Sequence, residues 1–120
     1  MLNKVAFTMY PAKDATRARA FYENTLGLSR GSHSKDGVWT EYDLPGGGCF
    51  ALFAGPGAEP AGTKGASIAL EVDDLDAVIK KLESDGVRFA QEMIHSPVCR
   101  MSVIFDSAGN TIVLHELEKR

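Results

Sequence analysis

Few side chains in this sequence have the type and position needed for chemistry, and His115 is the foremost of them. It lies in a strand-like run, residues 111–117, in which side chains alternate between two faces. An imidazole changes charge near neutral pH, which makes His115 a candidate general acid or base. The alternative is a solvated histidine near a strand end. His33 and His95 each lie at the end of a predicted strand, and we interpret both as loop residues.

The two cysteines lack the spacing of a metal site or of a disulfide framework. Cys49 and Cys99 both lie in apolar surroundings. Unpaired cysteine packs as a small hydrophobic residue, so we expect two free, packed thiols. The sequence therefore supplies no residue that we assign as catalytic.

Size and composition are those of an ordinary soluble domain. The chain has 120 residues, of which 44% are hydrophobic and 24% charged, and its formal net charge is −3. Without a cluster of Lys and Arg to contact phosphates, we expect no nucleic-acid partner. No apolar run approaches the roughly 20 residues of a membrane-spanning helix, and the first residues show no signal-peptide core. We therefore expect a cytoplasmic protein with no membrane partner.

The elements that position these residues follow one pattern that occurs twice. Asp14 begins a segment with apolar side chains on one helical face, and Gly27 ends it; Asp74 and Gly86 bound a second such segment. Each aspartate can accept hydrogen bonds from the first-turn N–H groups. Each glycine can adopt the left-handed conformation that ends a helix. The two predicted helices start half a chain length apart, which indicates an internal repeat.

One predicted strand precedes each helix and three follow it. In the first half the strands are residues 4–10, 28–33, 38–43 and 49–54, and in the second half they are residues 67–72, 87–94, 98–105 and 111–117. We predict an α+β fold, a single domain over residues 1–120 made of modules 1–58 and 64–120. A Gly-, Pro- and Ala-rich linker joins the two modules. Because a lone module would leave one sheet face wet, we expect the modules to form a cupped mixed sheet with the helices outside.

Several short motifs recur in a specific order along nearly the whole chain. The first half supplies Asp14, Arg19–Glu23 and Leu26–Leu28; the second half supplies Ile68–Ala77, and Asp106 with Gly109–Thr111. In this order the sequence resembles the vicinal oxygen chelate superfamily, which includes glyoxalase I, extradiol dioxygenases, and fosfomycin- and bleomycin-resistance proteins. The resemblance implies two βαβββ modules around a cavity (the glyoxalase/bleomycin-resistance fold) and commonly a homodimer.

The resemblance further implies a divalent metal held by four side chains, usually His, Gln or Glu, that chelates two neighbouring oxygens of a substrate. This sequence has no such side chain at any of the four positions. The first falls on Phe7, or on Lys4 with a bulge, and the second lies within residues 44–58, which contain no His, Gln, Glu or Asp. The third and fourth fall on Ser67 and Val113. Because apolar groups offer no lone pair, we expect no metal and no cofactor.

If those positions still face the cavity, strand alternation places a mostly apolar and aromatic set of side chains there, as in small-molecule pockets. The predicted ligand-binding residues are Phe7, Met9, Trp39, Ser67, Met101, Val113 and His115. The alternative is that these side chains only fill the core or, for Ser67, satisfy nearby polar groups.

Three functional hypotheses follow. The first is a metal-independent protein that binds an apolar or aromatic small organic molecule, similar to the bleomycin-resistance branch, and forms a homodimer. The second is a glyoxalase- or dioxygenase-like enzyme, a lyase, isomerase or dioxygenase, with a non-standard metal site or with His115 as acid or base. The third is a dimerising scaffold whose cavity is filled by side chains.

Overall fold

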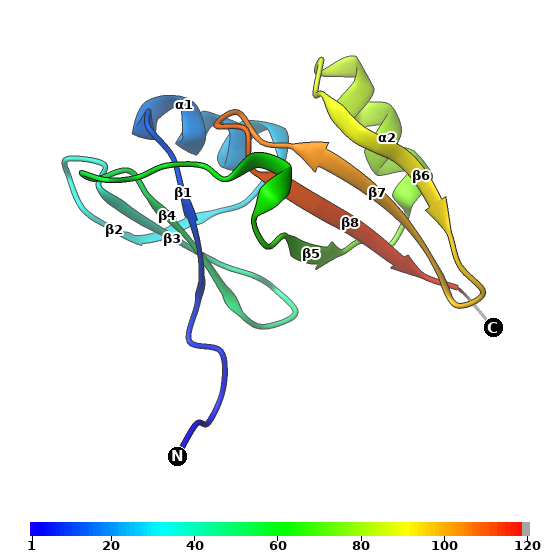
Figure 1. Cartoon of the computed structure of the whole chain (residues 1–120), viewed down its shortest axis with the longest axis horizontal. Helices are drawn as coiled ribbons and strands as arrows, with labels where there is room; N and C mark the ends of the chain where they lie inside the picture. The colour runs from blue at the N-terminus through cyan, green and yellow to red at the C-terminus, as the bar shows by residue number, and fades with distance from the viewer. Residues whose placement is uncertain (119–120) are drawn as a thin grey trace. The chain divides into compact units, whose positions relative to one another are not determined.

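Each half of the chain folds as a strand, a helix and three further strands. The computed structural model describes residues 1–118 (Figure 1). The first half contains β1 (Thr8–Pro11), α1 (Ala15–Ala20), β2 (Arg30–His33), β3 (Trp39–Asp43) and β4 (Cys49–Phe53). The second half contains β5 (Ile68–Glu71), α2 (Leu75–Ser84), β6 (Phe89–His95), β7 (Cys99–Phe105) and β8 (Thr111–Leu117). This order confirms the predicted α+β class and the two βαβββ modules.

The strands form two four-stranded mixed sheets. Their orders are β1-β4-β3-β2 and β5-β8-β7-β6, and in each sheet the first pair is parallel and the other two are antiparallel. The chain divides into two compact units, Met1–Pro60 and Ala61–Arg120, so each sheet belongs to one unit. The single domain with one cupped sheet stays a prediction.

Both helices begin and end at the residues that the sequence indicated. Asp14 accepts a hydrogen bond from the backbone N–H of Arg17 at 3.0 Å, and Asp74 accepts one from Ala77 at 3.1 Å. Both Gly27 and Gly86 have φ of 75°, a left-handed conformation that side chains with a Cβ rarely adopt. Local capping chemistry therefore fixes where each helix starts and where the chain turns back.

The first helix departs from a regular α-helix in its second half. It continues as a π-helical turn, Phe21–Thr25, in which the N–H of Leu26 donates to the carbonyl of Phe21 at 3.0 Å. This turn buries Tyr22, whose ring stacks on Tyr42 and contacts Phe50. The π-helical turn thus coincides with the burial of Tyr22 against the sheet, and apolar periodicity alone did not indicate it.

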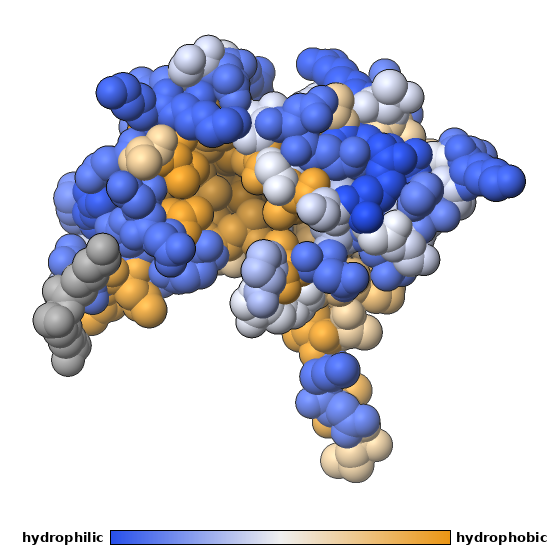
Figure 2. All heavy atoms as spheres, turned by 180° about the vertical axis from the view of Figure 1, so that it is seen from behind, coloured by the Kyte–Doolittle hydropathy of each residue, from blue (hydrophilic) through white to orange (hydrophobic). Residues whose placement is uncertain are grey.

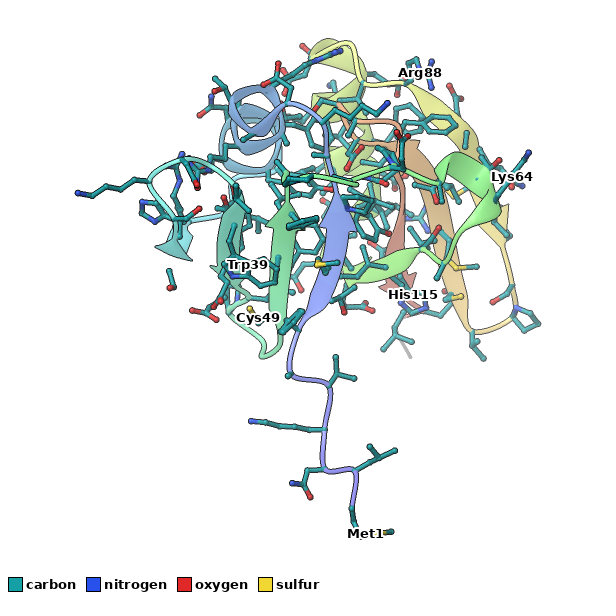
Figure 3. All side chains as sticks on the ribbon, turned by 60° about the vertical axis from the view of Figure 1, so that its left-hand side comes forward. Met1, Trp39, Cys49, Lys64, Arg88 and His115 are labelled. Carbon is teal, nitrogen blue, oxygen red and sulfur yellow. The ribbon has the colours of Figure 1, made fainter. Side chains whose placement is uncertain are left out.

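The first strand starts later than predicted. We expected residues 4–10, whereas β1 begins at Thr8 and ends at Pro11. Thr8 pairs with Phe50, and the partner strand β4 begins only one residue before Phe50, at Cys49. The Gly46–Gly48 turn precedes Cys49, and no strand remains to pair with the earlier residues. The segment before β1 accordingly runs as an extended chain away from the sheet (Figures 1 and 3).

Each helix covers one face of its own sheet. In the first unit the covered face carries the buried side chains Tyr10, Thr40, Tyr42, Phe50 and Leu52. In the second unit it carries the buried side chains Ser102, Ile104, Ile112 and Leu114, with Leu75 and Leu82 from α2. Both cysteines are free thiols, as expected, and Cys99 is buried. Within residues 1–118, no helix has the length and apolar character needed to cross a membrane.

A carboxylate at the π-helical turn ties the helix to two strands. Both carboxylate oxygens of Glu23 accept hydrogen bonds from the Arg30 guanidinium, at 2.8 and 3.0 Å. The buried Tyr42 hydroxyl donates to Glu23 Oε2 at 2.8 Å. Hydrogen bonding to Arg30 holds the pKa of Glu23 below its usual value, and burial raises the pKa of Tyr42 well above its usual value.

We predict that Glu23→Gln lowers the free energy of unfolding by about 1–2 kcal/mol at neutral pH, since hydrogen bonds to a charged group contribute more than neutral ones. Because the folded-state pKa of Glu23 is depressed, its contribution is present above the unfolded-state pKa and is lost as the pH falls through the folded-state value. Urea unfolding at a series of pH values should therefore show the difference between wild type and variant shrinking on acidification.

Glu59→Gln is the matched control. Glu59 pairs with Lys13 at 3.1 Å, but their side chains are 73% and 67% exposed, and such pairs contribute little. Equal losses of stability in the two variants would contradict the role assigned to Glu23.

Candidate functional site

Phe7, Met9 and Trp39 lie on the face of the first sheet that carries no helix, which we call the helix-free face of that sheet. In the strand register, Met9 pairs with Ala51, and Ala51 pairs with Glu41. Trp39 lies two residues before Glu41 on the same strand, so it points to the same face as Met9. Phe7 precedes Met9 by two residues, and both side chains remain 45% exposed. Three of the predicted ligand-binding residues are therefore together on one surface.

Trp39 is held by two contacts on this surface. Its ring meets Phe7 edge to face, with 5.2 Å between the ring centroids and 84° between the planes. Its indole N–H donates to Glu41 Oε2 at 2.8 Å. Trp39 is half-buried, and the hydrogen bond to the Glu41 carboxylate fixes the orientation of its ring. The result is an oriented aromatic pair with exposed surface, suited to contact a flat apolar group.

Glu41 also accepts a hydrogen bond from the Cys49 thiol, at 3.9 Å between Sγ and Oε1. Burial raises the pKa of Cys49, and the nearby charges of Glu41 and Asp43 raise it further. The thiol is therefore kept protonated, and a protonated thiol is a poor nucleophile. Strand alternation puts Glu41 on the face of Trp39, but it does not indicate the contact with Cys49.

Met101, Val113 and His115 lie together on the helix-free face of the second sheet. Met101 pairs with His115, and Val113 pairs with Val103. Ile112 and Leu114 alternate with them and are buried on the face that α2 covers. Met101, Val113 and His115 are all half-buried, so each retains some accessible surface.

His115 forms a hydrogen-bonded pair with Glu71 on this face. The ring Nδ1 lies 2.6 Å from Glu71 Oε1, and Glu71 Oε2 accepts the backbone N–H of Leu117 at 3.2 Å. The side chain of His115 is 25% exposed and that of Glu71 is 53% exposed. The hydrogen bond from His115 holds the pKa of Glu71 below its usual value.

Sequence reasoning assigned no role to Glu71, although it lies in one of the motifs that carry the family resemblance. It pairs with His115 across the parallel strands β5 and β8, whose register matches residue 71 with residue 115. The signal in the sequence that bears on Glu71 is strand alternation, which puts its side chain on the same face as Ala69. Finding its partner required the register between segments far apart in the chain.

The hydroxyl of Ser67 is engaged within the protein. It forms a hydrogen bond with the Thr111 hydroxyl, which ties the residue before β5 to the start of β8. Thr111 is buried and Ser67 is exposed. This contact supports the structural alternative for Ser67, and its part in ligand binding stays a prediction.

The side chains present do not fit the divalent metal that the family resemblance implies. Phe7 offers an aromatic ring, Val113 offers hydrocarbon, and the Ser67 hydroxyl bonds to Thr111. In the part of the chain that the structure describes, no group of three or more His, Cys, Asp or Glu side chains could hold a metal ion. Divalent metals require several such donors converging on one point.

Solved structures of similar fold cover almost the whole chain. An antibiotic-binding protein, TnmS3 from Streptomyces sp. CB03234, is 24% identical, with a TM-score of 0.79 and 98% of each chain covered. A glyoxalase/bleomycin resistance protein/dioxygenase superfamily member from Sphaerobacter thermophilus DSM 20745 is 26% identical, with a TM-score of 0.79 and 97% and 98% covered. A lactoylglutathione lyase from Agrobacterium tumefaciens is 19% identical, with a TM-score of 0.76 and 97% and 95% covered.

No curated protein matches the sequence. The family model described as Glyoxalase/Bleomycin resistance protein/Dioxygenase superfamily matches residues 4–114. That match spans both modules and every element described above except the last residues of β8. The chain therefore belongs to the glyoxalase/bleomycin resistance protein/dioxygenase superfamily.

Proposed function

We propose that this protein binds an apolar or aromatic small organic molecule without using a metal. The observation that carries the proposal is the character of the helix-free sheet faces, which present aromatic, thioether and aliphatic groups, with Phe7 and Val113 at two positions where the family resemblance implies metal ligands. TnmS3, one of the solved structures of similar fold, is described as an antibiotic-binding protein, which is in keeping with a binding role.

The first sheet supplies the apolar contact surface in this proposal. Phe7 and Met9 are each 45% exposed, which is unusual for large apolar side chains that sit beside one another on a sheet. Covering such surface gains about 25 cal/mol for each Å² removed from water. The edge-to-face pair of Phe7 and Trp39 is already assembled, so a ligand would not have to order it.

Hydrophobic residues are also visible on the molecular surface among hydrophilic ones (Figure 2). On the second sheet, Met101 and Val113 flank His115 and give that region a mixed character. A ligand in contact with these residues would meet hydrocarbon and one imidazole.

A second candidate function is an enzyme in which His115 acts as acid or base. It is favoured by one contact, the hydrogen bond between His115 Nδ1 and Glu71, because a carboxylate that orients an imidazole is a common feature of acid–base sites. The two functions differ in what happens to the bound compound. Recovery of an unchanged compound after prolonged incubation supports binding, and recovery of an altered compound supports the enzyme.

The family resemblance also leads us to propose a homodimer, which sedimentation equilibrium would test. The cytoplasmic location stays a prediction from the sequence.

We predict that metal ions leave the stability of the protein unchanged. A ligand that binds only the folded state at a hundredfold excess over its Kd adds about 2.7 kcal/mol, which for a domain of this size raises the Tm by roughly 10 °C. Thermal unfolding with Zn²⁺, Ni²⁺, Mn²⁺ or Fe²⁺, and after treatment with a chelator, should show no such rise or fall. A stoichiometric metal in the purified protein that also stabilises it would overturn the metal-independent function.

We predict that Phe7→Ala weakens the binding of aromatic compounds about five- to tenfold, because it removes roughly 1–1.4 kcal/mol of aromatic contact. Trp39 is the single tryptophan in the sequence, so its fluorescence reports binding on this face directly. Titrations of wild type and variant with a panel of planar aromatic compounds provide the affinities.

Val98→Ala is the matched control, since Val98 is 53% exposed, lies just before β7 and is not one of the predicted ligand-binding residues. Both variants should unfold at nearly the wild-type temperature. If Phe7→Ala and Val98→Ala bind equally well, Phe7 is not a ligand contact.

A further inference from the structure

We propose that the bound molecule carries a hydroxyl group that donates a hydrogen bond to Nε2 of His115, with Glu71 holding the imidazole in the required form. The ligand class is therefore an apolar or aromatic compound with an acidic hydroxyl, such as a phenol. This inference rests on the proposed binding function and specifies the chemistry of its ligand.

The Glu71–His115 contact determines which ring nitrogen can receive a hydrogen bond. An ionised carboxylate can only accept, so the 2.6 Å contact requires a proton on His115 Nδ1. The lowered pKa of Glu71 agrees with an ionised carboxylate. When the ring is neutral, its one lone pair is then at Nε2.

Glu71 is itself fixed on the sheet. Its other oxygen accepts the backbone N–H of Leu117 at 3.2 Å, so the carboxylate spans from β5 to two residues of β8. A carboxylate held at both oxygens has little freedom to rotate away from the imidazole. Glu71 therefore acts as a positioning residue for the ring.

Nε2 has no partner within the described chain. Among residues 1–118, the hydrogen bond to Glu71 is the one that His115 makes through its ring. The ring is only 25% exposed, so part of it is withdrawn from water. An acceptor in this position favours a ligand that brings a donor.

The residues beside His115 make that selection stricter. Met101 lies directly across from it on β7, and Val113 lies two residues before it on the same face. Neither side chain offers a hydrogen-bond donor, so a compound placed here would meet His115 Nε2, with the Glu71 carboxylate beside it, among apolar groups. A compound without an O–H would cover Nε2 and leave it unpaired, which costs binding free energy.

A stabilising role does not account for the pair equally well. The contact is partly exposed, and such surface contacts contribute little to folding, because water already solvates both groups and the side chains lose entropy. In this proposal the role of the pair is to fix one tautomer of the neutral ring.

The test uses pairs of compounds that differ only in the hydroxyl hydrogen. Phenol and anisole, 2-naphthol and 2-methoxynaphthalene, and the corresponding anthracene pair provide aryl hydroxyls and their methyl ethers in three sizes. Binding is measured calorimetrically near pH 8, where ordinary imidazoles are neutral. We expect at least one hydroxyl compound to bind wild type about tenfold more tightly than its ether, the factor that one hydrogen bond typically supplies.

Variants assign the preference to the imidazole. His115→Phe keeps a ring but removes the acceptor, so the ratio of the ether's Kd to the hydroxyl compound's Kd should fall to about one. His115→Gln keeps an acceptor and should retain part of the preference, which a merely structural role would not predict. Glu71→Gln should shift the neutral ring toward the Nε2–H tautomer, seen in ¹⁵N NMR of the imidazole, and lower the preference. His95→Phe, an exposed histidine at the end of β6, is the matched control.

The outcomes separate the two proposals. This inference is wrong, while the binding function stands, if aromatic compounds bind but each hydroxyl compound and its methyl ether have equal affinity. The same holds if the preference for the hydroxyl compound survives in His115→Phe. If no compound in either class binds to wild type, both proposals are overturned. Loss of the preference in His115→Phe with ether affinity unchanged supports the inference.

Discussion

Each four-stranded sheet has one helix, and one helix can cover only one face; the rest of this structure depends on that constraint. Strand alternation then assigns every side chain to the covered face or to the helix-free face. In the first sheet Tyr42 and Phe50 are buried under the helix, while Trp39 and Glu41 alternate to the other side. A slip of one residue in register would exchange the two sets and expose the aromatic core. The candidate site is therefore a direct consequence of how the core is packed.

Charged hydrogen bonds fix each helix to its own sheet on the covered side. In the first unit Glu23 joins the π-helical turn to Arg30 and Tyr42. In the second unit Arg100 on β7 pairs with Asp76 on α2 and with Glu116 on β8, and these two carboxylates raise the pKa of Arg100. Glu116 also accepts the N–H of Leu75 at the start of α2, at 2.8 Å. The repeated modules thus use different residues for the same purpose, and neither set uses a side chain of the helix-free faces.

The sequence was sufficient to predict what depends on local chemistry and on alternation. Asp14 and Asp74 as helix starts, the left-handed glycines, and the shared face of Met101, Val113 and His115 all belong to this class. It was insufficient where two distant segments must be aligned. The late start of β1 depends on where β4 begins, and the Glu71–His115 pair joins residues 44 positions apart. The π-helical turn at the buried Tyr22 was likewise missed, because helical periodicity does not distinguish it from a regular helix.

Two carboxylates on the helix-free faces, Glu41 and Glu71, are engaged by their own neighbours. Glu41 accepts from the Trp39 indole and the Cys49 thiol, and Glu71 accepts from His115 and the Leu117 amide. A metal site needs carboxylates whose lone pairs converge and whose mutual repulsion a cation offsets. Here each carboxylate is instead used to orient a ring, indole in one unit and imidazole in the other. The proposed function relies on such oriented rings with hydrocarbon around them, because they can select an uncharged ligand through shape and single hydrogen bonds.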